Sequence, residues 1–292
     1  MPDTPKADAP PLFFLHFPRT GGTTVDAIFA ANYPAEQILK IYSQEEFKKY
    51  QYIDEAAFAR FRFITGHLLL TGTNPTQFYG KPVRAFTFLR DPVKRLHSEY
   101  IFLKTWKNQH LYDYLNSRDI TFSQYITSTD KLLRYRGKNF MTRCISGHSL
   151  EKTDLAEALA KAKHNLEYAF LFFGIQERFM ESMLLLSKLT ELPNILHQKR
   201  NALTHAGAQA PMSAEEAELA QEYNSADMEL YRFAQELFAR RVAEAGPEFQ
   251  KQLKEYSFIN AKFQKISSLL YERVAEVQDE TDGIALSKDI RW

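Results

Sequence analysis

The sequence predicts an α/β fold, in which helices flank a central parallel sheet on both faces. Short runs rich in aromatic and β-branched residues, typical of buried parallel strands, alternate with longer stretches of helical periodicity. Strands that alternate with helices in this way indicate a parallel sheet. The predicted strands lie at 12–17, 61–67, 83–89 and 168–173.

Helical periodicity accounts for most of the chain between and after these strands. The first six predicted helices lie at 22–32, 44–60, 92–106, 121–146, 151–166 and 177–190. The sequence "SAEE" at 213–216 is a capping box that begins a further helix, and another helix follows at 226–243. No strand signal of comparable strength occurs beyond residue 190.

The last part of the chain predicts a long helix. "EAGPE" at 244–248 interrupts the helical pattern, and apolar residues then recur at intervals of three or four from 248 to 278. We therefore expect a disordered start at 1–10, a main domain at 11–245 and a helical C-terminal extension at 246–292. The near-heptad spacing permits a homodimer through this helix, and packing onto its own domain is the alternative.

Composition excludes several classes of protein. The 292 residues are 45% hydrophobic, which is enough to fill a sizeable core. Thirty-seven Lys and Arg face 36 Asp and Glu, so the net charge of +1 gives no global field for binding nucleic acid. Cys144 is the only cysteine, which excludes an intramolecular disulfide. Since no run approaches the ~20 apolar residues of a membrane helix, we expect a cytoplasmic protein.

The stretch "PLFFLHFPRTGGTTVDAIF" (11–29) is typical of an anion-binding turn. A hydrophobic strand leads into Gly21 and Gly22, and a helix follows at once, so that backbone amides and the helix N-terminus can surround an anion. The turn is not a Walker A loop, because glycine rather than lysine follows Gly21. An ordinary strand-to-helix turn is the alternative. The turn offers four further donors to an anion: Arg19, Thr20, Thr23 and Thr24.

A second anion-binding pattern is "FTFLRDPVKRLHSEY" (86–100). Arg90 follows the strand, Asp91 can cap the next helix, and Ser98 returns to the same helix face about two turns later. A guanidinium and a hydroxyl at these positions can hold a phosphate together. A structural ion pair between Arg90 and Asp91 is the alternative.

The two patterns together resemble the 5′-phosphosulfate and 3′-phosphate loops of sulfotransferases that use 3′-phosphoadenosine 5′-phosphosulfate (PAPS). The likeness spans roughly 12–240 and is nearest to the branch of heparan sulfate 2-O- and 6-O-sulfotransferases and their bacterial relatives. It implies a P-loop-like three-layer fold, PAPS as co-substrate, 3′-phosphoadenosine 5′-phosphate (PAP) as product, and no metal. It also implies that Arg90 and Ser98 bind the 3′-phosphate, and that six residues bind the 5′-phosphosulfate: Arg19, Thr20, Gly21, Gly22, Thr23 and Thr24.

Arg19 departs from many of these relatives, which have lysine at this position. An arginine keeps the positive charge that can stabilise the departing phosphate, but it stays protonated and is a poor proton donor. The resemblance thus implies an electrostatic catalytic role for Arg19.

The stretch "ITGHLLL" (64–70) resembles the Gly-His that follows the second strand of 2-O-sulfotransferases, where histidine is the proposed general base. This likeness implies that His67 accepts the proton of the acceptor hydroxyl, a task that suits an imidazole near neutral pH. A histidine that caps a strand end is the alternative. For His16, inside the first strand, we expect a hydrogen-bonded core role.

Two further stretches carry weaker signals. In "NFMTRCISG" (139–147), Arg143 is a candidate contact to nucleotide or acceptor, and a packed helix explains it equally well. In "HQKRN" (197–201), Lys199 and Arg200 are candidate phosphate contacts, with a solvated charge cluster as the alternative.

These observations predict a PAPS-dependent sulfotransferase that moves a sulfuryl group in line to an acceptor hydroxyl, with carbohydrate as the expected acceptor. One alternative is a P-loop nucleotide kinase or hydrolase, which the fold would permit. Another is a non-catalytic nucleotide-binding scaffold. The identity of the acceptor is beyond the sequence, because a fold does not determine its substrate.

Overall fold

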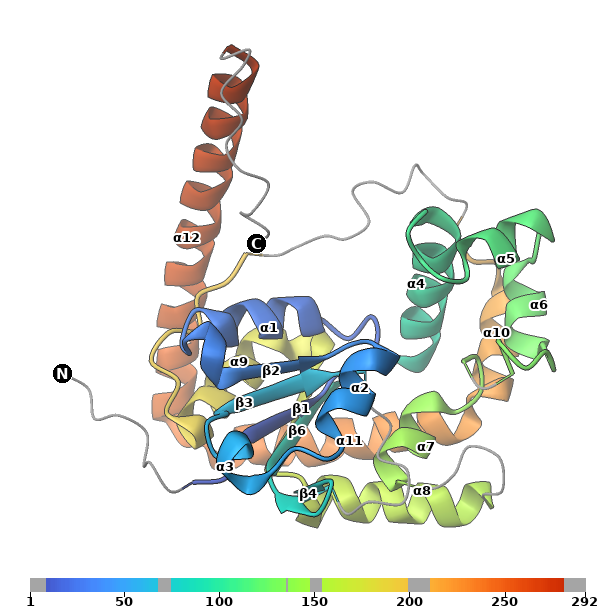
Figure 1. Cartoon of the computed structure of the whole chain (residues 1–292), viewed down its shortest axis with the longest axis horizontal. Coiled ribbons are helices and arrows are strands. Elements are labelled where there is room, and N and C mark those ends of the chain that lie inside the picture. The colour runs from blue at the N-terminus through green and yellow to red at the C-terminus, as the bar shows by residue number, and fades with distance from the viewer. Residues whose placement is uncertain (1–8, 68–74, 135, 148–153, 199–210, 281–292) are drawn as a thin grey trace.

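The protein folds around a five-stranded, wholly parallel sheet with helices on both faces (Figure 1), so the predicted fold class is confirmed. The computed structural model describes residues 9–67, 75–134, 136–147, 154–198 and 211–280. The sheet has the order β2-β3-β1-β6-β7. Its strands are β1 (Leu12–Leu15), β2 (Ile38–Ile41), β3 (Phe63–Gly66), β6 (Arg84–Leu89) and β7 (Phe172–Ile175).

The first strand lies at the centre of the sheet and fixes where its neighbours end. Leu15, the last residue of β1, lies opposite Gly66 of β3 and Thr87 of β6. Gly66 has no room for a side chain, since a Cβ there would lie 2.0 Å from the carbonyl oxygen of Ile41 in β2. Because parallel strands end at the same edge, the turns after β1, β3 and β6 meet.

Aromatic rings pack the sheet against its helices. The rings of Phe14 and Phe86 stack with centroids 4.9 Å apart, and Phe29 of α1 stacks on Phe63 at 4.1 Å. In Figure 1, α1 and α9 lie on one side of the sheet, and α8 and α11 on the other. The helices near the sheet are α1 (Gly22–Ala30), α2 (Gln44–Tyr50), α3 (Glu55–Phe58), α7 (Phe140–Ser146), α8 (Leu155–His164), α9 (Phe179–Thr190) and α11 (Ser225–Glu244).

Four helices form a lobe beside the sheet, at the right of Figure 1. They are α4 (Pro92–Thr105), α5 (Tyr112–Ser117), α6 (Phe122–Thr127) and α10 (Ala214–Tyr223). Their apolar side chains, among them Leu96, Leu115 and Tyr125, form a cluster separate from the main core. The predicted capping box at 213–216 is present, because the Ser213 hydroxyl accepts from the Glu216 amide.

The structure corrects the predicted boundaries in three places. The strand predicted at 168–173 is Phe172–Ile175, because α8 continues through a π-helical turn at Asn165–Ala169 that leaves Tyr168 71% exposed. The helix predicted at 44–60 is two helices, since Asp54 caps α3 and restarts the helical pattern. The helix predicted at 121–146 is also two, α6 and α7.

Three short strands were not predicted. The strand β2 has only four residues, and β4 (Gln77–Phe78) and β5 (Lys81–Pro82) form an antiparallel hairpin of two residues each. The exposed lysine in β2 interrupts the apolar run that marked the other strands of this length, and two-residue strands are too short to show a pattern.

The long C-terminal helix is present as α12 (Gly246–Glu280). Gly246 adopts φ +76°, which separates α12 sharply from α11. The first turns of α12 pack on the domain through buried Phe249 and Tyr256, and the Asn260 side chain accepts from the His197 amide at 2.8 Å. Beyond these contacts α12 projects away from the body (Figure 1). The homodimer expected through this helix stays a prediction.

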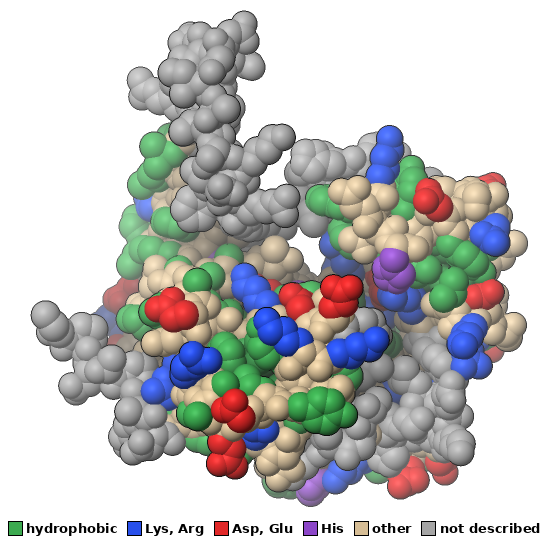
Figure 2. All heavy atoms as spheres, in the orientation of Figure 1, with side chains coloured by type: hydrophobic (Ala, Val, Ile, Leu, Met, Phe, Trp, Pro, Cys, Tyr) green, Lys and Arg blue, Asp and Glu red, His purple; other side chains and the backbone are tan. Residues whose placement is uncertain are grey.

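Among the described residues, no helix is both long and apolar enough to span a membrane, and no group of acidic, His or Cys side chains is placed to hold a metal ion. Figure 2 shows charged side chains of both signs interspersed over the visible face.

Candidate active site

The turns after β1 and β6 bring together the residues predicted to bind an anion. Arg90 Nη1 donates to the Arg19 carbonyl oxygen at 2.9 Å, and Arg19 Nε donates to Ser98 Oγ at 3.0 Å. Arg19 itself adopts a left-handed conformation with φ +69°, and Gly21 follows at φ +89°. These two conformations produce a tight turn between β1 and α1.

The N-terminus of α1 has free backbone donors at this turn. The Thr24 amide donates to the Gly21 carbonyl at 3.0 Å, whereas the amides of Gly22 and Thr23 donate to no residue in the described part of the chain. No side chain caps α1, and its first turn contains no acidic residue. By contrast, Asp91 caps α4 by accepting from the Lys94 amide at 2.9 Å, as predicted. The α1 N-terminus is therefore suited to accept an anion from outside the chain.

The other residues of the turn are constrained by the fold. The Thr20 hydroxyl is buried and donates to the Phe17 carbonyl at 2.9 Å, so any contact it makes with an anion would come from its amide. A Cβ on Gly22 would lie 1.8 Å from His16 Nε2, so only glycine fits there. The Thr23 side chain is exposed at the start of α1.

The two guanidinium groups create a local positive site. Burial lowers the pKa of both Arg19 and Arg90, and the charge of Arg90 lowers the pKa of Arg19 further. Arg90 Nε is buried with no hydrogen-bond partner among the described residues. Asp91 caps α4 and lies outside ion-pair distance of Arg90, and the charges of Glu177 and Asp91 act to raise the pKa of Arg90 against the effect of burial.

His67 lies at the same edge, directly after β3. Its Nδ1 is 2.9 Å from the carbonyl oxygen of His16, and since a carbonyl can only accept, Nδ1 carries the proton. The Nε2 atom of a neutral ring is then left with a free lone pair. Burial is the main cause that lowers the pKa of His67, which favours this neutral form.

A polar network that the sequence did not predict lies behind His67. Tyr42 donates to a carboxylate oxygen of Asp26, and Thr65 Oγ1 donates to the other oxygen at 2.8 Å. His16 Nδ1 then donates to the Tyr42 hydroxyl at 2.9 Å. Burial, with a smaller effect of His67, holds the pKa of His16 well below its usual value. The ring of Tyr42 packs edge-on against that of His67, with centroids 4.9 Å apart.

Two signals could have identified this network, and each was incomplete. Asp26 lies one turn after the anion-binding turn on α1, but a charged residue on a short helix is common. Tyr42 follows β2, a strand that sequence periodicity did not show. The expected hydrogen-bonded role of His16 agrees with its contact to Tyr42.

The remaining candidates add little to the site. Arg143 lies half-buried in the last turn of α7, and Cys144 beside it is buried. Lys199 and Arg200 lie outside the described residues. A cavity of about 240 Å³ next to Arg90 is lined in part by Asp91, Glu177 and Tyr231.

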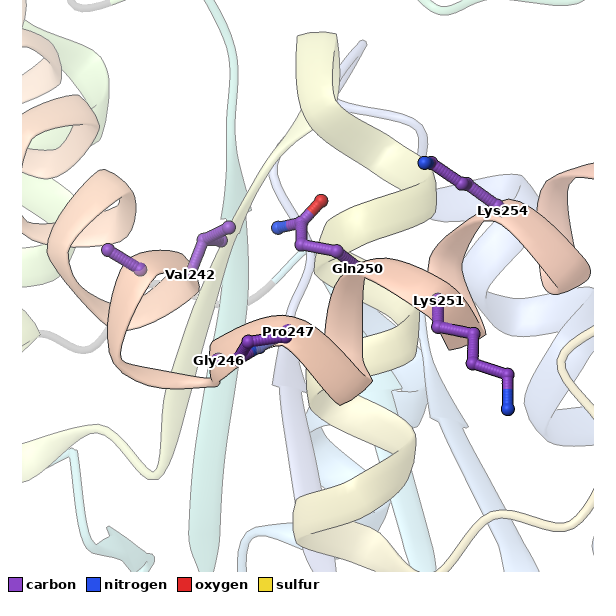
Figure 3. Close-up of a pocket in the computed structure, with 7 residues that line it drawn as sticks. Val242, Gly246, Pro247, Gln250, Lys251 and Lys254 are labelled. Carbon is purple, nitrogen blue, oxygen red and sulfur yellow. The ribbon is translucent and has the colours of Figure 1, made fainter.

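A cavity of about 590 Å³ lies elsewhere (Figure 3). It is an open hollow where α11 meets α12, lined by Val242, Ala243, Gly246, Pro247, Gln250, Lys251 and Lys254. None of these residues was predicted to bind nucleotide. The candidate active site is thus the sheet edge and not this hollow.

Comparison with known proteins identifies the class. The family model for galactose-3-O-sulfotransferase matches residues 4–281, which is most of the chain. The protein is therefore a sulfotransferase by family. More particularly, it belongs to the galactose-3-O-sulfotransferase family.

The chain also matches nine solved chains, among them mouse sulfotransferase SULT7A1 complexed with PAP. The identity is 12% and the TM-score 0.32, with 75% of this chain and 66% of that chain covered. The match therefore spans slightly less than two thirds of the mouse protein. No curated protein matches the chain. The nearer likeness to the heparan sulfate branch stays a prediction.

Proposed function

We propose that this protein transfers the sulfuryl group of PAPS to a hydroxyl of a galactose-containing carbohydrate. The family supports sulfuryl transfer, and the name of the family suggests the acceptor. The observation that carries the use of PAPS is the juxtaposition of Arg19, Arg90 and Ser98 beside the uncapped N-terminus of α1. Two anion-binding groups at one sheet edge suit a nucleotide with phosphate at two positions.

The residues present fit such a nucleotide. The free amides of Gly22 and Thr23 and the hydroxyl of Thr23 would hold the 5′-phosphosulfate. Arg90 and Ser98 would hold the 3′-phosphate, and the unpartnered Nε of Arg90 leaves a buried donor for it. PAPS, when bound, supplies an activated sulfuryl group.

His67 is the group best placed to accept a proton. As the acceptor oxygen forms its bond to sulfur, the bond between sulfur and the 5′-phosphate oxygen breaks, and the acceptor proton moves to His67 Nε2. The hydrogen bond from Nδ1 to the His16 carbonyl orients the ring and stabilises the protonated imidazole that results. The α1 amides stabilise the charge that develops on the departing phosphate.

The test combines binding with turnover. PAP should bind in isothermal titration calorimetry, and PAPS with a β-galactoside should give a sulfated sugar detectable by mass spectrometry. ATP hydrolysis with Mg²⁺ and no sulfated product would favour the kinase or hydrolase alternative. Binding of PAP without turnover of any sugar in a broad panel would favour the scaffold alternative.

A further inference from the structure

We infer that Asp26 and Tyr42 are positioning residues for His67: the Asp26 carboxylate, held by two hydroxyl groups, orients the imidazole through Tyr42 and stabilises it once it carries the acceptor proton. The inference rests on the proposed function, because it assumes that His67 is the general base. It goes beyond that function, which gives neither Asp26 nor Tyr42 a role.

The pairing of β2 with β3 places Tyr42 beside His67. Ile41 lies opposite Gly66 at the ends of the two strands, so the next residues, Tyr42 and His67, leave the sheet side by side. The Tyr42 ring meets the imidazole edge-on, with centroids 4.9 Å apart and an angle of 82° between the planes. The ring of His16 lies 4.6 Å from the same imidazole. His67 is thus packed against two rings.

Asp26 holds Tyr42 in this position. One carboxylate oxygen accepts from the Tyr42 hydroxyl, and the other accepts from Thr65 Oγ1 at 2.8 Å. Burial and, after it, the charge of Asp26 raise the pKa of Tyr42, so the hydroxyl keeps its proton and donates it. Because both hydroxyls donate to it, Asp26 accepts on both oxygens, which is the pattern of an ionised carboxylate.

No lysine or arginine among the described residues forms an ion pair with Asp26. Its nearest basic contact is His16 Nδ1 at 3.8 Å, and burial holds the pKa of His16 well below its usual value, so that ring is neutral. Burial raises the pKa of Asp26, whereas the bonds from Tyr42 and Thr65 lower it. A buried carboxylate without a cation is costly, and such groups are typical of functional sites. Asp26 therefore suits a positive charge that forms only during the reaction.

Proton transfer to His67 creates this charge. As the acceptor oxygen bonds to sulfur, the departing phosphate keeps the electron pair of its bond to sulfur, and the acceptor proton moves to Nε2. The imidazole then has a proton on both nitrogens and is a cation. The His16 carbonyl accepts from Nδ1, and Asp26 supplies a negative charge nearby, so both favour the protonated ring.

The other charges around His67 largely oppose each other. Burial lowers the pKa of His67 most, and the hydrogen bond to His16 and the charge of Asp26 act in the opposite direction. The charge of Glu99 also raises this pKa and that of Arg136 lowers it, and these two side chains are bonded to each other at 3.0 Å. The titratable or charged groups that face the imidazole are His16 after β1, Asp26 on α1, Tyr42 after β2, Glu99 on α4 and Arg136 before α7.

The experiment measures the protonation of His67 directly and together with turnover. On the full chain, Asp26→Asn and Tyr42→Phe, an NMR titration of the imidazole Cε1–H signal, assigned with His67→Ala, gives the midpoint of protonation without nucleotide. Kinetics with PAPS and a β-galactoside gives kcat and KM, and calorimetry gives the affinity for PAP. Asp113→Asn, exposed on α5, and Tyr52→Phe, 84% exposed, are the matched controls. Thermal unfolding checks folding, and Tyr42→Phe serves if Asp26→Asn does not fold.

We expect Asp26→Asn to lower kcat by about tenfold to a hundredfold, as for a carboxylate that acts through an imidazole. The midpoint of His67 should move to lower pH, because asparagine keeps the shape of the side chain and removes its charge. Tyr42→Phe should show smaller changes in the same directions, since Asp26 loses one of its two hydroxyl donors. The KM for PAPS and the affinity for PAP should change little in both variants, and the controls should match the unmodified protein.

A loss of turnover in Asp26→Asn with an unchanged midpoint would reduce the network to a structural role and overturn the inference. Weaker binding of PAP in the same variant would assign Asp26 to the nucleotide site and also overturn it. Full turnover in His67→Ala would remove the base and the inference with it. A lower midpoint in Asp26→Asn, with no sulfated product from the unmodified protein, would support the coupling of Asp26 to His67 and reject the proposed function.

Discussion

The sheet edge and the outer face of α12 present opposite kinds of unsatisfied surface. At the sheet edge the Gly22 and Thr23 amides and Arg90 Nε have no hydrogen-bond partner among the described residues. On α12, Phe258, Ile259, Ile266, Leu269 and Leu270 are exposed, each by more than half. Unpaired polar groups favour a polar ligand, whereas an apolar stripe favours a protein surface. We therefore expect a polar ligand at the sheet edge and a protein partner on α12.

The largest effect is expected at the sheet edge, from His67→Ala. Turnover should fall by about 10²–10⁴-fold, because the variant loses its general base. The affinity for PAP should change little, because the ring's hydrogen bond goes to the chain itself. Steady-state kinetics with calorimetry on the same preparation measures both.

His164→Ala, a histidine in the last turn of α8, is the matched control. A His67→Ala protein with unchanged turnover would remove His67 from the mechanism. One that no longer binds PAP would give it a structural role instead.

The second prediction separates the two faces of α12. Phe249 is fully buried and Phe258 is 65% exposed, although both lie on the same helix. Phe249→Ala should lower the free energy of unfolding by about 3–5 kcal/mol, because it leaves a cavity against the domain. Phe258→Ala should change it by at most about 0.5 kcal/mol. Urea denaturation of dilute protein measures both values.

Similar effects of the two Phe substitutions would contradict the structural division of α12. A small loss for both would mean that the helix contributes little to the fold, and a large loss for both would mean that Phe258 is covered.

The sequence predicted most of the sheet edge because each motif there combines a strand end with residues of special chemistry. "PRTGGTT", "RDPVKRLHS" and the Gly-His pair all follow strands of a parallel sheet, so their meeting in space follows from topology. The network of His16, Asp26, Tyr42 and Thr65 could not be predicted in this way. It requires the pairing of β2 with β3, and β2, with an exposed lysine in its sequence ILKI, lacks the continuous apolar run that marked the other four-residue strands.

The direction of individual side chains could also not be predicted from the sequence. The motif placed Arg19 in the anion-binding turn, but its contact with Ser98 depends on a left-handed backbone and on the packing of α4. For α12 the period predicted the helix correctly. The period could not show at which residue α12 leaves the surface of the domain, since the apolar spacing continues past the last buried residue.

The third prediction concerns pH. Burial lowers the pKa of His67 below its usual 6.5, so the neutral base should predominate at pH 7. The rate at saturating PAPS should decline as the pH falls, with a midpoint below 6.5. A pH–rate profile measures this limb, and His67→Ala should lack it. A limb centred above 7 would mean that another group titrates or that a nearby charge raises the pKa of His67.

The smallest effect is expected on the exposed stripe of α12, where we predict a weak dimer with a second copy of this chain. The stripe lies on a helix that projects from the body (Figure 1), and hydrophobic side chains line its visible part (Figure 2). Residues 248–265 contain four lysines and two glutamates, whereas 272–280 contain four acidic residues and one arginine. Antiparallel pairing of two copies places each basic half against an acidic half, so charge favours a second copy.

Light scattering over a range of concentrations should show a monomer–dimer equilibrium. Leu269→Asp should raise its dissociation constant by about tenfold or more, because a charge is introduced into the stripe. Ser268→Asn, an exposed neutral change on the same helix, is the control, because it leaves both the apolar side chains and the charges of the helix intact. Both variants should bind PAP as the unmodified protein does, since neither residue contacts the sheet edge. A protein that remains monomeric at high concentration would end the dimer prediction, and a loss of PAP binding in Leu269→Asp would show that the two regions are coupled.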